Sequence, residues 1–253
     1  MAVKKQFATC RFLSEVNRGR YPEGTRCPKS LRINRMVCRD VLARTASIAL
    51  QSPLGALPPS NRVFFVIESI RAFDRLPDVL AITAKRFEDE RGWFSESWSK
   101  RNLLASGIDL PEFVQDNHSM SFAKGTVRGL HFQAPPHAQG KLVRCGRGSL
   151  FDVAVDVRRG SPTYGEWVGE ELTVQNGVQL WIPAGFLHGF VTLEDDTEIV
   201  YKCTDFYSRE CDGAVRWDSV GIEWPMTGEV KLSEKDAAAQ PFDRFESPFS
   251  WEG

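Results

Sequence analysis

The sequence lacks any apolar run of the roughly 18 residues that a membrane-spanning helix needs, and its longest candidates are short, such as Val63–Ile67 and Phe186–Leu193. It also lacks an excess of charge, because 32 Lys and Arg stand against 33 Asp and Glu. This balance argues against a surface built throughout for nucleic acid or anionic lipid. With 253 residues, 42% of them hydrophobic, the chain can bury one sizeable core. We therefore expect a soluble protein that binds neither nucleic acid nor membrane.

Cysteine is scarce, and the six present form neither a CxxC pair nor a Cys/His group with zinc spacing. The N-terminus shows no charged segment leading into an apolar signal core. We therefore expect reduced thiols in a cytoplasmic protein. Cysteines in strand-like contexts, as in the last two thirds of this chain, are usually small buried hydrophobes. The six are Cys10, Cys27, Cys38, Cys145, Cys203 and Cys211.

Charge is distributed unevenly along the chain. Residues 1–65 hold 12 Lys and Arg against three acidic residues, net +9, whereas residues 66–253 hold 20 basic and 30 acidic residues, net −10. The first segment has no hydrophobic period and ends in the Pro-rich stretch Ser52–Ser60, which is typical of a linker. Four interpretations stay open for it: a disordered basic tail, translation from upstream of the true start, a transit-like segment, or a basic arm for an acidic partner.

From Val66 onward, short strand-like runs alternate with Gly, Pro and Asp turns, which predicts an all-β sandwich or barrel. Leu150–Val157 alternates apolar and polar residues, as a strand with one packed face does. Two short helices are expected, at Lys100–Ser106 and at Ser233–Ala239, where Ser233 would N-cap and Asp236 follows three residues later. The other expected strands are Gly92–Trp98, Val127–Gln133, Lys141–Cys145, Glu166–Val174, Val178–Pro183, Phe190–Leu193 and Glu198–Thr204.

Histidine is also rare, and two of the four lie among polar residues in strand and turn contexts: His131 and His188. A histidine inside a barrel is a metal ligand, a base or a satisfied core group. The spacing Pro183-x-Gly185-x-x-His188 resembles the second motif of cupin barrels, and Gly129-x-His131 resembles the first. Position 133, where metal-binding cupins carry a second histidine, is Gln133. Too few ligands remain for a catalytic metal, so we expect a metal-free pocket.

Eight motifs in the same order resemble the dTDP-4-dehydrorhamnose 3,5-epimerase family over about residues 67–239. The resemblance implies a cupin-type double-stranded β-helix, a jelly-roll barrel with a few short helices, at residues 66–253. It does not reach residues 1–65, for which the composition leaves a basic low-order extension or a mis-chosen start. It also implies a homodimer with strand exchange around Ile67–Thr83. The motifs are Asp89–Ser97, Phe113–Ser119, Val127–Gln133, Gln139–Cys145, Phe151–Asp156, Leu180–Pro183, His188–Leu193 and Tyr201–Asp205.

The implied reaction inverts C3 and C5 of dTDP-4-dehydro-6-deoxy-D-glucose and gives dTDP-4-dehydro-L-rhamnose, a precursor for L-rhamnose. The C4 ketone acidifies both neighbouring C–H bonds through an enolate, so the implied reaction requires no redox or metal cofactor. It requires a base, an acid and a cation or donor near the enolate oxygen. Family positions assign the base to His131, the acid to Tyr201, the cation to Lys141 and the partner of the base to Asp236. Simpler roles compete: a helix terminus for Asp236, a surface lysine for Lys141 and a core ring for Tyr201.

Further residues are implied to bind the substrate. Cationic side chains suit the diphosphate, and Tyr207 resembles the aromatic residue that stacks on thymine. Phe206 stands where members often carry a second Tyr, and Asp212 where Glu is common. Any one of the polar residues could instead be a solvated loop charge. The implied set is Arg91, Glu96, Gln115, Asp116, Asn117, Arg128, His188, Tyr207, Asp212 and Lys235.

Three other functions compete with this one. A related enzyme could invert one centre only, or move the ketone; Tyr201 favours the double epimerase, because members without this acid tend toward partial reactions. A sugar-nucleotide-binding barrel without catalysis would tolerate loss of His131 or Lys141, and both are present. A metal-dependent cupin oxygenase is disfavoured by Gln133.

Overall fold

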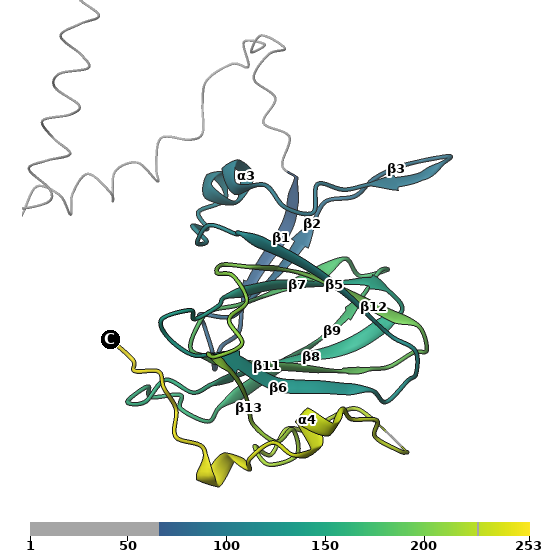
Figure 1. The fold of residues 1–253 in the computed structure, drawn as a ribbon. Helices are drawn as coiled ribbons and strands as arrows, with labels where there is room; N and C mark the ends of the chain where they lie inside the picture. The colour runs from purple at the N-terminus through teal and green to yellow at the C-terminus, as the bar shows by residue number, and fades with distance from the viewer. Residues whose placement is uncertain (1–65, 227) are drawn as a thin grey trace, which may run out of the picture. The chain divides into compact units, whose positions relative to one another are not determined.

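The computed structural model of the chain describes residues 66–226 and 228–253. The predictions for residues 1–65, for the linker Ser52–Ser60 and for three of the cysteines lie outside these residues. In the described part, strands form two antiparallel sheets that face each other, as in a jelly-roll barrel (Figure 1). The strands are β1 (Ile67–Ala72), β2 (Leu80–Ala84), β3 (Phe87–Asp89), β4 (Gly92–Phe94), β5 (Gln115–Ser121), β6 (Val127–Gln133), β7 (Lys141–Arg147), β8 (Ser149–Asp156), β9 (Trp167–Thr173), β10 (Val178–Ile182), β11 (Phe186–Thr192), β12 (Thr197–Cys203) and β13 (Asp212–Ala214).

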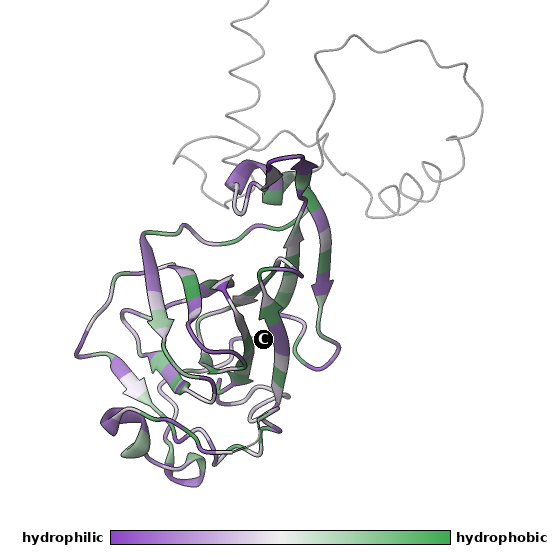
Figure 2. Cartoon of the chain, turned by 90° about the vertical axis from the view of Figure 1, so that its right-hand side faces the viewer, coloured by the Kyte–Doolittle hydropathy of each residue, from purple (hydrophilic) through white to green (hydrophobic). Residues whose placement is uncertain are grey.

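The order of strands shows how distant segments meet. One sheet runs β1-β2-β10-β7-β12-β5 and the other β13-β6-β11-β8-β9, while β3 and β4 form a separate hairpin. Alternate residues of each strand point between the sheets, so the two sheets share one apolar core. Val143, Leu180 and Ile199 of the first sheet meet Leu150 and Leu172 of the second in this core. Alternation of hydrophobic and hydrophilic residues along the strands is visible in Figure 2.

A second apolar cluster covers the back of the five-stranded sheet. Val153, Val155 and Leu187 pack there against Phe245 and Phe249 of the C-terminal segment, which runs below this sheet in Figure 1. This cover corrects the prediction of one packed face for Leu150–Val157. Both faces of β8 are buried, and even its polar residues Asp152 and Asp156 are 0% exposed.

The outer face of the six-stranded sheet is covered in part by a third cluster. Leu142 and Trp181 pack there with Leu103 of helix α3 (Lys100–Ala105). The β3–β4 hairpin extends away from both sheets (Figure 1), and its aromatic residues Trp93 and Phe94 are exposed by 51% and 68%. An exposed aromatic pair on a projecting hairpin is a candidate contact surface.

Most of the predicted elements are confirmed, with shifted ends. Val127–Gln133 matches β6 without a shift, and α3 lies within the range Lys100–Ser106. Helix α4 (Glu234–Ala237) is shorter than predicted, but Ser233 does cap it by accepting a hydrogen bond from the Asp236 N–H. The prediction Phe190–Leu193 was too short, because β11 begins at Phe186. A short 3-10 helix, η2 (Phe242–Arg244), and strands β1, β2, β3, β5 and β13 were not predicted.

The described cysteines are free thiols. Cys145 and Cys203 are buried, as expected, and Cys211 is only half-buried in a turn. Burial raises the pKa of the Cys145 thiol to about 11, so it stays protonated at neutral pH. Among the described residues, no helix is long and apolar enough to span a bilayer.

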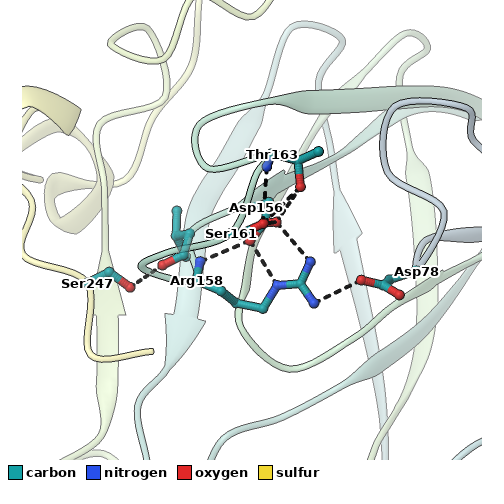
Figure 3. A network of polar contacts seen from close by, with 7 residues as sticks. Asp78, Asp156, Arg158, Ser161, Thr163 and Ser247 are labelled. Atoms are coloured by element: carbon teal, nitrogen blue, oxygen red, sulfur yellow. Dashed lines mark hydrogen bonds and ion pairs between the residues drawn. The ribbon is translucent and has the colours of Figure 1, made fainter. Parts of the chain in front are cut away.

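A polar network closes one end of strand β8 (Figure 3). Both oxygens of the Asp156 carboxylate accept hydrogen bonds from the Arg158 guanidinium, at 2.9 and 2.8 Å. One of them also accepts bonds from Ser161 at 2.6 Å and from Thr163 at 2.7 Å. Arg158 reaches on to Asp78 of the β1–β2 connection, at 2.8 Å. Burial acts to raise the pKa of Asp156, but these hydrogen bonds outweigh it and hold the pKa below its usual value.

Candidate active site

Residues from five strands, from helix α4 and from the segment before it line a cavity of about 430 Å³ between the sheets. Its walls include the side chains that the sequence put forward as catalytic: His131 of β6, Lys141 of β7, Tyr201 of β12 and Asp236 of α4. Arg128 and His188, predicted to bind substrate, line it too. The residues predicted to carry the chemistry, which span more than 100 positions of sequence, therefore share one concave site.

Strand β6 brings Arg128 and His131 to this cavity through a local irregularity. Three residues apart, they would point to opposite faces of a regular strand. The register between β6 and β11 shifts next to His188, so that His188 pairs with His131 while Phe190 pairs with Arg128. Gly129 makes the shift possible: its φ is +115°, and a Cβ there would lie 2.7 Å from the backbone oxygen of His188. Such bulges re-aim side chains at functional sites.

His131 is held from behind by a buried carboxylate. Its Nε2 lies 2.5 Å from Oδ1 of Asp236, whose side chain is 4% exposed. Burial acts to raise the pKa of Asp236, but hydrogen bonds from His131, Ser233 and the Gly129 backbone outweigh it and lower the pKa. The carboxylate therefore stays ionised at neutral pH and fixes a proton on Nε2, which leaves Nδ1 free to accept one.

His188 forms a second pair with a carboxylate, deeper in the barrel. Its Nε2 lies 2.7 Å from Oδ1 of Asp152, and both side chains are buried. Oδ2 of Asp152 has no hydrogen-bond partner among the described residues. Burial lowers the pKa of His188, against the attraction of Asp152, so the imidazole is neutral at pH 7. Asp152 was missed by sequence reasoning, although the alternation of β8 placed it on the face opposite Val153.

Loss of water around Lys141 and Tyr201 shifts the pKa of both side chains. Desolvation lowers the pKa of the Lys141 ammonium, while the negative charges of Asp152 and Asp212 oppose it. Desolvation likewise raises the pKa of the Tyr201 hydroxyl above 10.0, so it keeps its proton. Perturbed groups gathered in one cavity are typical of active sites.

A second cavity of about 210 Å³ adjoins the first, since both are lined by His131, Lys141, Tyr201 and Lys235. Its other walls hold further residues predicted to bind the substrate: Gln115, Asn117, Tyr207 and Asp212. The Tyr207 hydroxyl donates to Asp212 at 3.3 Å, and the Lys235 ammonium contacts the same carboxylate oxygen. The smaller cavity thus carries an acidic group, Asp212, and a basic group, Lys235.

Three predicted binding residues do not lie in these cavities. Asp116 points to the other face of β5 and pairs with the Lys202 ammonium at 2.9 Å. Arg91 lies on the β3–β4 hairpin and pairs with Asp89, and Glu96 accepts a hydrogen bond from Asn102 at 2.5 Å. Sequence reasoning also missed Ser119 and Lys231, which line the larger cavity.

Gln133 does not face an ion-binding cluster. Its side chain is 5% exposed, bonds to loop backbone and is part of the lining of the smaller cavity. Within residues 66–226 and 228–253, no three His, Cys, Asp or Glu side chains group closely enough to hold a metal ion.

Comparison with known proteins shows which family this chain is similar to. The family model for dTDP-4-dehydrorhamnose 3,5-epimerase matches residues 74–244. The chain is 54% identical to the dTDP-4-dehydrorhamnose 3,5-epimerase of Sinorhizobium fredii over 169 residues, which is 64% of this chain and 84% of that enzyme. It is 51% identical to the Salmonella typhimurium enzyme over 171 residues, 67% of this chain and 93% of that one.

A solved structure shows the same likeness in three dimensions. The 3,5-epimerase of Legionella pneumophila, crystallised in complex with dTDP-4-keto-L-rhamnose, superposes with a TM-score of 0.69 at 42% identity. The match covers 73% of this chain and 99% of that one. The residues left over on this chain are mainly those before the family match begins. On sequence and fold together, this chain belongs to the dTDP-4-dehydrorhamnose 3,5-epimerase family.

Proposed function

We propose that the chain is an isomerase that inverts C3 and C5 of dTDP-4-dehydro-6-deoxy-D-glucose to give dTDP-4-dehydro-L-rhamnose, in L-rhamnose precursor synthesis. One observation carries the proposal. His131, backed by Asp236 at 2.5 Å, opens into a cavity that Lys141 and Tyr201 also line. A base, a cation and a hydroxyl acid in one site are what proton transfer next to a ketone requires.

His131 is the proposed base. With Nε2 occupied by Asp236, its Nδ1 takes a proton from the carbon next to the C4 ketone, and the pair of electrons moves into an enolate. The ionised carboxylate stabilises the imidazolium that results. A positioned base contributes about 10²–10⁴-fold to such a step.

Lys141 is the proposed stabiliser of the enolate oxygen. Its ammonium is a compact charge in a site withdrawn from water, where attraction to a developing anion is stronger than in solvent. Tyr201 is the proposed acid, which returns a proton to the opposite face of the carbon. Its raised pKa keeps the proton available at neutral pH. Each centre then inverts through one proton removal and one proton return.

The nucleotide end of the substrate belongs in the smaller cavity. The exposed ring of Tyr207 offers a stacking surface for the base, and Lys235 and Arg128 offer positive charge for the diphosphate. Gln115 and Asn117, hydrogen-bonded to each other at 3.0 Å, supply polar groups beside them. We propose these roles, with His188 and Asp212, as those of the substrate-binding residues.

We also propose that two copies form a homodimer. Arg91 and Glu96, which the family positions place at the substrate, lie on or just after the projecting hairpin and outside both cavities. A second copy would bring them to a site and cover Trp93 and Phe94. Strand exchange around Ile67–Thr83 stays part of this proposal, because β1 is the edge strand of its sheet. A monomer at micromolar concentration in sedimentation would contradict it.

The remaining proposals concern the context of the enzyme. We propose that residues 66–253 form the epimerase domain, since every assigned residue lies within it. We also propose that the chain acts in the cytoplasm, in keeping with free thiols at Cys145, Cys203 and Cys211.

The reaction can be tested by incubating the full chain with dTDP-4-keto-6-deoxyglucose in D₂O and following deuterium entry by NMR. Label at both C3 and C5, with formation of the L-configured product, is the expected result. Label at one carbon would instead favour the single-centre epimerase. A ketone that moves to another carbon would reveal a ketoisomerase, and label at neither carbon would overturn the function for this substrate.

A further inference from the structure

The segment Asp205–Ser208, between β12 and β13, carries two exposed rings. Phe206 is 62% and Tyr207 is 59% exposed, and Tyr207 borders the smaller cavity. Aromatic rings in open loops have little packing to hold them in place. A loop that is to present a flat ring to a ligand therefore needs its backbone fixed by other means.

Glutamine side chains from the barrel fix this backbone. Gln139 donates to the carbonyl of Asp205 at 2.7 Å. Gln133 donates to the carbonyl of Phe206 at 2.9 Å and accepts from the Ser208 N–H at 2.8 Å. Gln115 accepts from the Tyr207 N–H at 3.0 Å. Each of the four loop residues is thus bonded through its backbone to a glutamine.

Gln133 is the central member of this set. It is only 5% exposed, and its second N–H donates to the carbonyl of His137. Both donors and the carbonyl oxygen of its amide are engaged, so the side chain has one orientation that satisfies all partners. A carboxylate of the same length would set a negative oxygen against two carbonyl oxygens. An apolar residue would leave three buried backbone groups without partners.

The Tyr207 ring is held at its far end as well. Its hydroxyl donates to Asp212, and that carboxylate is fixed in turn by the Lys235 ammonium. Strand pairing places Asp212 opposite Gln133 in the β13–β6 register. The backbone anchor and the hydroxyl anchor of the ring therefore come from paired strands, and the exposed ring is rigidly placed before any ligand binds.

We infer that Gln133 is a positioning residue for nucleotide recognition: it fixes the loop whose Tyr207 ring receives the nucleobase. This inference rests on the proposed function, because it takes the ligand to be a dTDP-sugar. It explains why a buried glutamine occupies the strand position next but one to the proposed base. Gln133 acts through Tyr207 and touches no reacting atom, so its loss raises KM and leaves kcat nearly unchanged.

The test compares two nearly isosteric substitutions in the full chain. Gln133→Met removes the clamp, while Thr197→Val is the matched control at the other end of strand β12. Thr197 is 2% exposed, and its hydroxyl holds a different turn through the carbonyls of Ser149 and Glu194. Both variants lose buried hydrogen bonds, so both lower the melting temperature.

Only Gln133→Met is expected to raise KM for the dTDP-sugar and Kd for dTDP, each by about tenfold, with kcat within about twofold of wild type. Hydrogen exchange at the Ser208 amide should accelerate in Gln133→Met and not in Thr197→Val. Unchanged KM and Kd in Gln133→Met, or a fall in kcat without a change in KM, would overturn the inference.

Gln133→Glu gives an independent reading if the methionine variant does not fold. Burial raises the pKa of a carboxyl group, and its protonated form regains one donor. The ratio of dTDP Kd between this variant and wild type should therefore fall as the pH drops from about 8 to about 5.5. A ratio near one at every pH would overturn the inference. Failure of the wild-type chain to exchange deuterium into the sugar, with dTDP still bound, would overturn the proposed function alone.

Discussion

Two carboxylates on strand β8 are equally buried but differ in how many hydrogen-bond partners they have. Asp156 and Asp152 are both 0% exposed and both face the inside of the barrel. Asp156 is bonded to Arg158, Ser161 and Thr163, and both of its oxygens have partners (Figure 3). Among residues 66–226 and 228–253, Asp152 has His188 on one carboxylate oxygen and no hydrogen-bond partner on the other. The same strand therefore carries a satisfied carboxylate that joins chain segments and an under-satisfied one that lies with the titratable groups of the cavity.

The difference indicates that Asp156 stabilises the fold, whereas Asp152 belongs to the reactive site. A buried charge with all its partners is costly to change and contributes to one fixed structure. A buried carboxylate with a free oxygen can still accept a hydrogen bond. Such groups cluster at functional sites. We therefore expect substitutions around Asp156 to act on stability, and substitutions around Lys141 and His131 to act on rate.

The largest expected effect is on rate, from Lys141→Met. Removing a group that stabilises an oxyanion lowers kcat by about 10²–10³-fold, and the melting temperature should change little. In the wild type, the ammonium form is the active one and its pKa lies below 10.5, so the rate should fall on the basic side at a lower pH than for an ordinary lysine. Steady-state kinetics across pH measure both effects. Lys100→Met, in an exposed pair with Glu112, is the control.

The next effect is on stability, from Asp156→Asn. Leaving Arg158 without its buried partner should lower the free energy of unfolding by about 3 kcal/mol at pH 7. The folded-state pKa lies below 3.8, so this stabilisation is full above the unfolded pKa and is lost as the pH falls through the folded one. Urea unfolding between pH 6 and pH 3 should show the wild type and the variant converging.

Asp152→Asn sharpens the contrast. Because one oxygen of Asp152 has a partner within the described part of the chain, replacing this carboxylate should cost about 1.5 kcal/mol of stability, less than at Asp156, and it changes the charge near Lys141. Turnover should therefore fall more than in Asp156→Asn, while the melting temperature falls less. Equal losses of stability in the two variants would remove the distinction between them.

A smaller effect on rate is expected from Tyr201→Phe. The ring stays and only the hydroxyl goes, so deuterium exchange should persist while net inversion slows by about 10²-fold, the lower end of what a positioned acid contributes. NMR in D₂O reports exchange and inversion separately. If binding and turnover were lost together, Tyr201 would be a packing residue.

The smallest effect is expected from removing residues 1–65. Every assigned residue lies between Arg91 and Asp236, and the family match begins at residue 74. A chain beginning at Val66 should therefore turn over within about twofold of the full chain. Its melting temperature should lie within a few degrees at about 0.15 M salt, where charge contacts are screened beyond roughly 8 Å. Aggregation or loss of dimers on truncation would show a structural role for the segment.

Much of the fold could be predicted from the sequence, because strand alternation and turn residues are local signals. The capping of α4 by Ser233 and the strand Val127–Gln133 are examples. The burial of both faces of β8 could not, since it depends on Phe245 and Phe249, almost 100 residues further along the chain.

Some features of the site could likewise be predicted from the sequence, and others could not. The family positions gave His131, Lys141, Tyr201 and Asp236, and the structure gathers all four. The direction of Asp116 followed from the pleat of β5 only once the partner strand was known. The bulge at Gly129 and the pairing of His188 with Asp152 depend on register, which local composition does not fix.

The central claim is that the chemistry resides at the cavity of His131, apart from the satisfied network around Asp156. Deuterium entry at C3 and C5 in D₂O, measured side by side in His131→Ala and Asp156→Asn at a temperature where both are folded, tests it most directly. We expect His131→Ala to lose exchange at both carbons by about 10²-fold or more, the contribution of a general base, and still to bind dTDP. Asp156→Asn should exchange at nearly the wild-type rate. Wild-type exchange in His131→Ala would contradict the account.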